Sequence, residues 1–247
     1  MKFKLLDMVK NKKIYALICC RGGSKGIPKK NIKLFVNKPL LFWVINEAKK
    51  SKIFDKIILS TDSSMISKLA KSYGVFVPGL RPKKLAKDSS DVFETHKYIF
   101  SKLKLNDNNS HICILNNNPF ISSNLIKKSF KISKKNKFNS IVLDSREIRG
   151  DYIYYRQMKL KNDKLISIFP KDFLKSTINR QSDNKFFSTI NNIRWAKPSV
   201  LSNYNIYKKS IIKNGVYPIF LSKMLDFDLD DMQDWKIAET IFSNLIK

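Results

Sequence analysis

Apolar residues form two kinds of run along the chain as far as residue 145. Short, continuous apolar runs between polar residues are typical of strands buried on both faces of a parallel sheet. Longer runs repeat apolar residues every three to four positions, which predicts helices with one buried face. The predicted strands are residues 14–20, 56–60, 75–77, 111–115 and 140–144, and the predicted helices are residues 39–50, 64–73, 91–103 and 122–135. This alternation predicts an α/β fold, a mostly parallel sheet flanked by helices.

The pattern changes after residue 146. Residues 152–160 and 165–169 read as antiparallel strands, and residues 173–198 read as irregular and polar. We interpret residues 146–197 as an insertion, a lid or a dimerisation arm, within a single domain that spans residues 14–247. The pattern then predicts strands at residues 200–207 and 216–221 and a closing amphipathic helix at residues 232–246.

The charge of the chain is strongly positive, with 48 lysine and arginine residues against 20 acidic ones and a net charge of +28. Such a balance is one sign of a nucleic-acid-binding protein. Here the lysines are spread along the whole chain among asparagines, and no arginine-rich arm or run of alternating basic and aromatic residues occurs. We therefore do not expect nucleic acid as the partner, although a basic RNA-binding protein remains an alternative.

The cysteines and the apolar runs bear on the compartment. Cys19 and Cys20 are adjacent and Cys113 lies in another apolar run, so no zinc-site or disulfide spacing is present. Buried, reduced thiols indicate a cytoplasmic protein.

No run approaches the ~18 apolar residues needed to span a bilayer, so we expect no membrane insertion. Residues 1–13 lack the apolar core of a signal peptide and are interpreted as a lead-in to the first strand.

The first chemistry-bearing stretch follows the first predicted strand. Residues 21–31 read RGGSKGIPKKN and hold three of the seven glycines of the chain. Four cations surround these glycines, namely Arg21, Lys25, Lys29 and Lys30. A turn rich in free N–H groups and positive side chains after a buried strand is typical of phosphate binding. The spacing is neither that of a Walker loop nor that of a dinucleotide-binding turn.

The second stretch, DFDLDDMQDW at residues 226–235, is acidic. Asp228 and Asp230 are two positions apart, so on an extended segment both carboxylates lie on one face and suit a hard cation such as Mg²⁺. Asp231 and Asp234 are equally suited to capping the next helix. A polyphosphate cradle with a carboxylate metal site predicts nucleotidyl or phosphoryl transfer.

Smaller signals leave two readings open. Asp62 ends a predicted strand, where it either contacts a ligand or stabilises its own turn. His96 and His111 belong to no recognisable catalytic triad, so we expect structural roles for both.

Four segments in the same order resemble the acylneuraminate cytidylyltransferases, the family that makes CMP-sialic acid and related CMP-sugars. They are ALICCRGGSKGIPKKNI, NKPLLFWVINEAKKSKIFDKIILSTDS, VPGLRPKKLAKDSS and DFDLDDMQDWKIAE. The resemblance implies a nucleotide-diphospho-sugar transferase fold and a reaction of CTP with a 2-keto sugar acid. It also implies Mg²⁺ and a homodimer in which the inserted arm reaches the partner's site.

The resemblance also implies roles for individual residues. Asp228 and Asp230 would be the metal ligands, and together with Arg21 and Lys25 they are the candidate catalytic residues. The implied nucleotide-binding residues are Arg21, Gly22, Gly23, Ser24, Lys25, Lys30, Asn31, Arg81 and Ser89 (or its neighbour Ser90). The attacking group would be the anomeric hydroxyl of the sugar acid, and the general base is not readable from the sequence.

The sugar side departs from the family pattern. Where relatives carry a glutamine and, six residues later, an arginine, this chain has Leu115 and Ile121 around an Asn-Asn-Asn segment. The candidate substrate-binding residues are Asp62, Asn117, Asn118, Arg180, Gln181 and Tyr204. The sugar is therefore open: a sialic-acid-like nonulosonic acid is expected, with legionaminic, pseudaminic or deoxy-octulosonic acid as alternatives. An inactive cytidylyltransferase-like scaffold is a further alternative.

Overall fold

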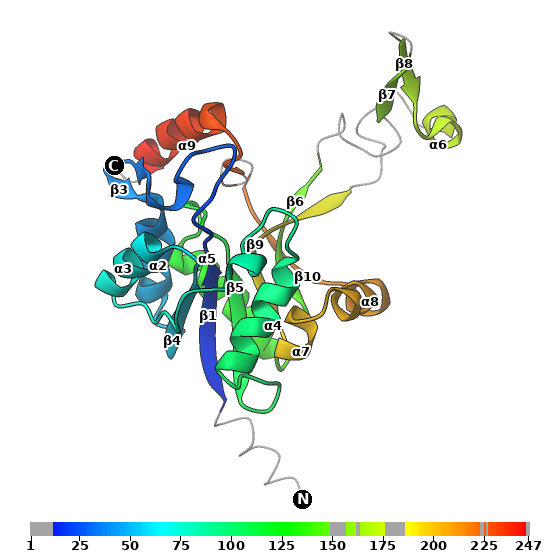
Figure 1. Cartoon of the computed structure of the whole chain (residues 1–247). Helices are drawn as coiled ribbons and strands as arrows, with labels where there is room; N and C mark the ends of the chain where they lie inside the picture. Colours follow the sequence, from blue (N-terminus) through cyan, green and yellow to red (C-terminus); the bar gives the residue numbers. More distant parts are fainter. Residues whose placement is uncertain are drawn as a thin grey trace, which may run out of the picture.

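A six-stranded sheet forms the centre of the computed structural model, which describes residues 12–148, 157–161, 164–175, 186–222, 225 and 227–245 (Figure 1). Its strand order is β10-β6-β9-β5-β1-β4. The strands are β1 (Lys13–Cys19), β4 (Lys56–Ser60), β5 (Ser110–Leu115), β6 (Val142–Glu147), β9 (Phe187–Ala196) and β10 (Tyr217–Phe220). β1 runs parallel to β4 and β5, and β10 runs parallel to β6, whereas β9 is antiparallel to both of its neighbours. The predicted mostly parallel sheet is confirmed.

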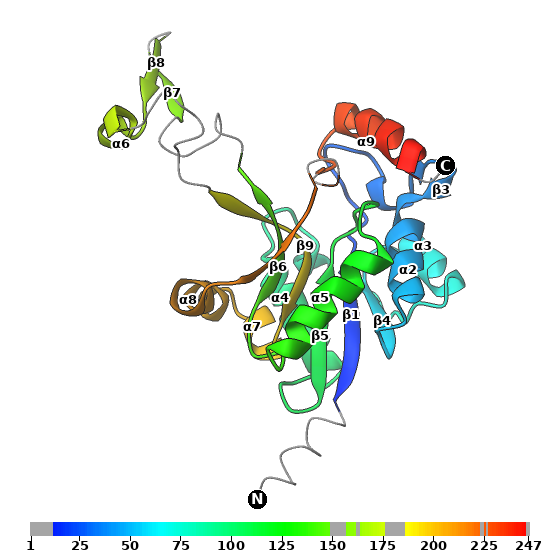
Figure 2. The ribbon, with the colours of Figure 1, turned by 180° about the vertical axis from the view of Figure 1, so that it is seen from behind.

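Helices cover both faces of this sheet. The helices and 3-10 turns of the main body are η1 (Lys30–Ile32), α2 (Leu40–Ser51), α3 (Ser64–Ser72), η2 (Lys83–Leu85), α4 (Val92–Lys102), α5 (Ser123–Lys135), α7 (Pro198–Leu201), α8 (Tyr204–Asn214) and α9 (Met232–Leu245). Comparison of the two opposite views places α4 and α7 on one face and α5 on the other (Figures 1 and 2). Side chains fix where three helices begin, because Ser63, Asp91 and Ser122 each accept a first-turn backbone N–H.

Two apolar layers follow from the alternation of side chains along the strands. Ala16 and Ile18 of β1 pack in one buried cluster with residues of α2, α3 and α5. Leu17 points the opposite way, into a cluster with residues of α4, α7 and α8. Burial on both faces explains why β1 reads as a continuous apolar run.

A third apolar cluster lies beside the sheet and holds the end of the chain. Trp235 of α9 packs against Phe35 with ring centroids 5.2 Å apart, and Ile27 and Leu229 are buried in the same cluster. Phe35 lies in β2 (Leu34–Phe35), which pairs with β3 (Lys38–Pro39). This packing brings the two chemistry-bearing stretches together although about 200 residues separate them.

The prediction of irregular structure for residues 173–198 is wrong for β9, a ten-residue strand between β5 and β6. The sequence hid this strand because Asn191 and Asn192 interrupt it and read as a turn. Asn191 adopts a left-handed conformation (φ 67°), and the pairing of β9 with β6 shifts register beside it. The polar pair is a bulge inside a strand rather than the end of one.

The prediction of a strand at residues 200–207 is also wrong, since α7 and α8 occupy this region. Asn203 accepts the backbone N–H groups of Asn205 and Ile206 at 3.0 and 3.1 Å, which starts α8. Tyr207 then faces the buried cluster one turn before the half-buried Ile211, which is helical spacing. Residues 75–77 form only a single bridge, between Phe76 and Ile58.

An antiparallel hairpin stands apart from the central sheet in both views (Figures 1 and 2). It consists of β7 (Met158–Lys161) and β8 (Lys164–Ser167), with the short α6 (Pro170–Lys175) after it. This confirms the antiparallel pairing predicted here, while residues 152–156 of the predicted strand lie outside the described residues. Within the described part of the chain, no helix combines the length and the apolar character needed to cross a membrane.

Candidate active site

The glycine-rich loop leaves the carboxyl end of β1 and is held there by Asp62. The Asp62 carboxylate accepts the Gly22 N–H at 2.9 Å and lies 3.7 Å from a guanidinium nitrogen of the buried Arg81. A Cβ at Gly22 would lie 3.0 Å from the Ser63 Cβ, so glycine allows this close approach. These contacts give Asp62 a role outside the two considered from the sequence, because it fixes the glycine-rich loop rather than its own turn.

The acidic stretch docks directly on the loop. A Cβ at Gly26 would overlap the backbone carbonyl oxygen of Asp230. The Lys30 ammonium donates a hydrogen bond to the carbonyl oxygen of Leu229. Burial lowers the pKa of Lys30, and the nearby Asp230 and Asp228 carboxylates oppose this shift.

The four aspartates of this stretch that the structure describes divide into two pairs. Asp231 accepts the N–H groups of Gln233 and Asp234 at 2.8 and 2.9 Å, so it caps α9. Asp234 accepts the N–H groups of Asp230 and Asp231. Asp228 and Asp230 are exposed on either side of the buried Leu229, so both carboxylates lie on the open side of an extended segment. Two carboxylates in this arrangement fit a hard cation that binds oxygen.

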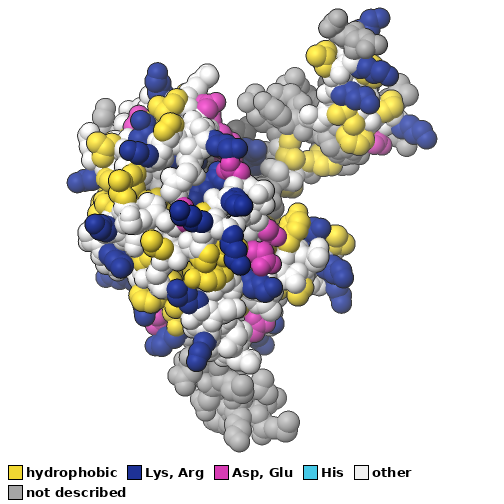
Figure 3. All heavy atoms as spheres, in the orientation of Figure 1, with side chains coloured by type: hydrophobic (Ala, Val, Ile, Leu, Met, Phe, Trp, Pro, Cys, Tyr) yellow, Lys and Arg dark blue, Asp and Glu magenta, His cyan; other side chains and the backbone are white. Residues whose placement is uncertain are grey.

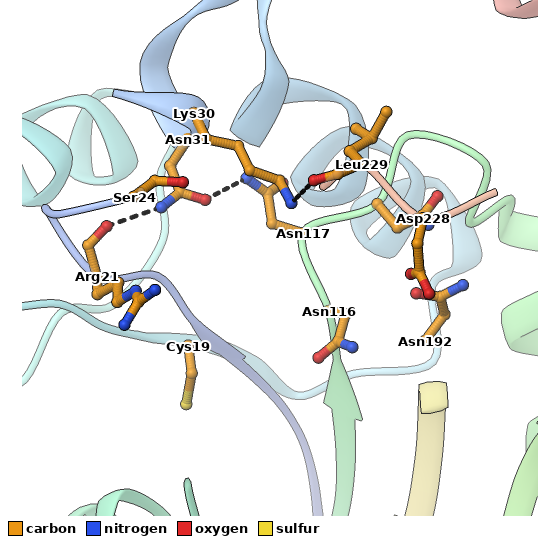
Figure 4. A pocket seen from close by; sticks show the side chains of 11 residues that line it. Cys19, Arg21, Ser24, Lys30, Asn31, Asn116, Asn117, Asn192, Asp228 and Leu229 are labelled. Carbon is orange, nitrogen blue, oxygen red and sulfur yellow. Dashed lines mark hydrogen bonds between the residues drawn. The ribbon is translucent and has the colours of Figure 1, made fainter. Parts of the chain in front are cut away.

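A chain of amides links the loop to the end of β5 (Figure 4). Asn31 donates to the Arg21 carbonyl at 2.8 Å, and Asn117 donates to the Asn31 side-chain oxygen at 2.8 Å. Because a backbone carbonyl only accepts, this direction leaves the buried Asn117 Oδ1 as an acceptor with no hydrogen-bond partner among the described residues.

Asn118 connects the same loop to the acidic stretch. Its amide nitrogen donates to the Phe227 carbonyl at 2.8 Å, while its side-chain oxygen accepts the Phe120 N–H at 2.9 Å. Both ends of the amide are therefore occupied, which indicates that Asn118 positions the backbone next to Asp228.

These contacts surround a polar pocket of about 250 Å³ at the carboxyl ends of β1 and β5 (Figure 4). The carboxyl edge of a parallel sheet is where ligands bind in α/β folds. The pocket is lined by Cys19, Arg21, Ser24, Lys30, Asn31, Asn116, Asn117, Asn118, Asn192, Asp228 and Leu229. Seven of the residues predicted from the sequence are among them: Arg21, Ser24, Lys30, Asn31, Asn117, Asn118 and Asp228.

Other predicted residues lie beside the pocket rather than in its lining. Gly22, Gly23 and Lys25 belong to the same loop, and Asp230 lies one residue beyond Leu229. Ser89 is exposed in the turn after η2. The structure does not bring Tyr204 to the pocket: this residue begins α8 and packs against Phe93 at 5.3 Å. Arg180 and Gln181 lie outside the described residues.

The side chain of Asp88 bridges two cations of the loop. It lies 2.7 Å from the Lys25 ammonium and also accepts a hydrogen bond from the Arg21 guanidinium. These hydrogen bonds, that of Lys25 foremost, lower the pKa of Asp88. One carboxylate therefore offsets part of the positive charge of the two side chains that are expected to hold phosphate.

Cys19 and Asn192 also line the pocket, although the sequence analysis did not select them. Burial raises the pKa of the Cys19 thiol to about 11, so it is not a thiolate nucleophile at neutral pH. Asn192 is 3% exposed and comes from the bulge of β9. The one available signal was the Asn-Asn pair inside an otherwise strand-like run.

The histidines have structural surroundings. His96 is fully buried, and its Nδ1 hydrogen-bonds with the Leu201 carbonyl at 2.9 Å. Burial lowers the pKa of His96 to about 4. The ring of His111 stacks on Phe138 at 3.8 Å, away from the pocket.

Comparison with protein families decides the classification. A family model described as cytidylyltransferase matches residues 15–203. The chain belongs to this cytidylyltransferase family. The match confirms the resemblance seen in the sequence, and it spans the glycine-rich loop, the Asn116–Asn118 segment and β9.

Two curated relatives support this membership. The chain is 30% identical to an N-acylneuraminate cytidylyltransferase of Escherichia coli over 233 residues, which cover 93% of this chain and 52% of that protein. It is 29% identical to a pseudaminic acid cytidylyltransferase of Campylobacter jejuni, over 92% of this chain and 94% of that protein. The chain spans about half the length, or less, of several other curated relatives that it matches.

A solved structure supports the fold. The structure of CMP:2-keto-3-deoxy-manno-octonic acid synthetase complexed with CTP superposes with a TM-score of 0.69. The superposition covers 95% of this chain and all of that chain at 12% sequence identity. The predicted nucleotide-diphospho-sugar transferase fold is confirmed.

Proposed function

We propose that this chain transfers the cytidylyl group of CTP to a 2-keto sugar acid of the nonulosonic type, giving a CMP-sugar and pyrophosphate. The observation that carries the proposal is the docking of the Asp228–Asp230 segment on the glycine-rich loop, through Gly26 and Lys30. This contact sets carboxylates next to a cationic loop that follows a parallel strand. Names of relatives in the cytidylyltransferase family support cytosine as the base and a sugar acid as the acceptor.

The loop supplies the phosphate side of the proposed reaction. Arg21 and Lys25 are available for the triphosphate once it replaces the Asp88 carboxylate between them. Lys30 is half-buried beside the acidic stretch, where the low local dielectric strengthens its attraction for phosphate oxygens. Charge that develops on the leaving pyrophosphate is thereby stabilised.

Asp228 and Asp230 are the proposed Mg²⁺ ligands, because they offer two exposed carboxylates next to the pocket. When bound, Mg²⁺ would supply positive charge that neutralises the charge developing in the transfer. Asp231 and Asp234 are not proposed as ligands, since they accept backbone N–H groups at the start of α9.

The side of the pocket lined by Asn116, Asn117, Asn118 and Asn192 is the proposed binding side for the sugar acid, the acceptor of the cytidylyl group. In the proposed step the anomeric hydroxyl oxygen of the sugar acid forms a bond to the α-phosphorus and loses its proton to solvent, while the bond to pyrophosphate breaks and pyrophosphate leaves with the electron pair. The Asn117 Oδ1 atom has no hydrogen-bond partner within the part of the chain that the structure describes, so it is suited to accept from a hydroxyl or amide group of the sugar.

We further propose a homodimer formed through the β7–β8 hairpin. Leu160 and Leu165 are paired across the hairpin and are 70% and 69% exposed. Exposed leucines in contact with each other are typical of an interface. Replacement of both by serine should convert a dimer to a monomer in light scattering; a wild-type monomer would contradict this proposal.

We place the reaction in the cytoplasm, since CTP is available there and the three cysteines are free thiols.

A basic RNA-binding protein is less consistent with the surface. Lysine and arginine side chains are spread over the visible face and do not gather in one stripe (Figure 3). The docked acidic stretch would also repel a phosphate backbone.

Mass spectrometry of the product tests the proposal. Wild-type protein with CTP, Mg²⁺ and a panel of nonulosonic and octulosonic acids should form one CMP-sugar. The Asp228→Asn variant should keep its fold by circular dichroism and lose at least ~100-fold in kcat, as expected when charge stabilisation is removed. Full activity of this variant would contradict the metal assignment.

A further inference from the structure

The β9 bulge is built around a buried carboxylate, Asp144, that the proposed chemistry does not use. Leu143 pairs with Arg194, and Ser145 pairs with Thr189. Between these two pairs β6 has one residue, Asp144, whereas β9 has four, residues 190–193, and these extra residues form the bulge. The side chain of Asp144 has no exposed surface. Its two oxygens accept the N–H groups of Asn192 and Ile193, each at 3.0 Å.

Two backbone donors converge on this one side chain. A carboxylate offers an acceptor oxygen to each, whereas an asparagine would offer one oxygen and turn an NH₂ group toward the second N–H. Burial raises the pKa of Asp144 to about 6, and the hydrogen bonds from Ile193 and Asn192 oppose this shift. Burying a carboxylate inside a sheet costs more folding free energy than burying an apolar side chain there. The presence of Asp144 therefore indicates that it positions the backbone it binds.

The bulge acts on the pocket in two ways. It directs the buried Asn192 into the pocket that Asp228 also lines, and the two side chains point toward each other in the view of Figure 4. It also holds the carboxyl end of β5, because the Asn116 N–H donates to the Asn192 carbonyl at 2.9 Å. Asn116 begins the segment whose Asn118 holds the backbone beside Asp228.

We propose that Asp144 is a positioning residue for the acceptor side of the pocket. Its carboxylate fixes the bulge that presents Asn192 and anchors the Asn116–Asn118 segment where the sugar acid binds. The inference rests on the proposed function. The glycine-rich loop is also held by contacts outside the bulge, those of Asp62 and Lys30, so we expect the larger effect of Asp144 on the sugar acid.

Steady-state kinetics of Asp144→Asn test this role. The expected result is a rise of at least tenfold in the KM for the sugar acid, with the KM for CTP within twofold of wild type. Ser129→Ala is the matched control, because Ser129 accepts a hydrogen bond at 2.8 Å from Trp195 of β9, outside both the bulge and the pocket lining. It should lower the melting temperature and leave both KM values unchanged. Equal changes in both KM values, or wild-type values for Asp144→Asn, would overturn the inference.

Two further measurements keep the outcome decisive. Asn192→Ala leaves the carboxylate and the backbone bulge in place, and it should raise the same KM selectively even if Asp144→Asn fails to fold. Unchanged kinetics of Asn192→Ala would overturn the inference. Wild-type protein without turnover on any acid would contradict the proposed function instead. Hydrogen exchange of backbone amides then tests the inference without turnover. Asp144→Asn, or Asp144→Ser where Asp144→Asn does not fold, should speed exchange at the amides of Asn192, Ile193 and Asn116. Unchanged exchange would overturn the inference.

Discussion

Gly26 and Asp230 are in backbone contact, so close that a single added methyl group at Gly26 would overlap the Asp230 carbonyl oxygen. This contact joins the loop after β1 to the segment before α9. The position of the proposed metal ligands therefore depends on a residue that carries no side chain.

Gly26→Ala is predicted to impair both stability and catalysis. The methyl group must displace the backbone of Asp230, which costs about 1–3 kcal/mol as an overpacking effect. A shift of about 1 Å in catalytic groups is enough for a ~100-fold loss of kcat. Denaturant unfolding and initial rates measure the two effects.

Gly23→Ala is the matched control for Gly26→Ala. A Cβ at Gly23 meets no atom within 4 Å, so this variant should unfold like the wild type. Equal stability and activity of the two alanine variants would contradict the docking of the acidic stretch on the loop.

Asp88→Asn is predicted to improve CTP binding slightly. The Asp88 carboxylate bridges Lys25 and Arg21, and a triphosphate must compete with it for these cations. Because the pair is exposed, its removal should lower the KM for CTP by no more than about fivefold, as expected for the small contribution of exposed ion pairs. A higher KM for CTP would show instead that Asp88 assists binding.

Asn118→Ala is predicted to weaken metal use. The substitution leaves the Phe227 carbonyl and the Phe120 N–H without their hydrogen-bond partner, which costs about 1–3 kcal/mol of stability for each of the two groups. The freed backbone lies next to Asp228, so the Mg²⁺ concentration for half-maximal activity should rise. Asn108→Ala, in an exposed turn before β5, is the control and should stay within about 0.5 kcal/mol of wild type. An unchanged Mg²⁺ requirement for Asn118→Ala would contradict this positioning.

His96 is predicted to make folding stability depend on pH. Its pKa is 6.5 in a reference peptide and about 4 when buried, so between these values the unfolded chain binds a proton that the folded chain does not. Stability is therefore fully present above pH 6.5 and falls as the pH falls to about 4, by at most about 1.4 kcal/mol per pH unit.

His96→Asn isolates this contribution of His96, because asparagine keeps a donor for the Leu201 carbonyl and does not titrate. Asp144, whose pKa is raised to about 6, titrates in the same window with the opposite sign, but it is present in both proteins. The difference between the two stability curves should therefore slope between pH 4 and 6.5. A flat difference would contradict a buried, neutral His96.

The sequence was sufficient for elements whose signal is local. β1, α2, α4 and α5 follow from apolar periodicity and caps, and the pocket edge follows from the loop and acidic motifs. β9 was missed because its pattern depends on distant partners, whereas α8 was missed although its cap at Asn203 is a local signal. The Asn191–Asn192 pair becomes a bulge only when Asp144 of another strand supplies two acceptors. Gly26 likewise reads as a turn glycine until Asp230 packs on it from the far end of the chain.

Pyrophosphate release measured with each of the four nucleoside triphosphates, with and without a 2-keto sugar acid, is the most direct test of cytidylyl transfer. The account predicts release with CTP alone among the four, only when Mg²⁺ and the accepted sugar acid are both present. Release that needs no sugar acid, or equal release with all four triphosphates, would contradict it.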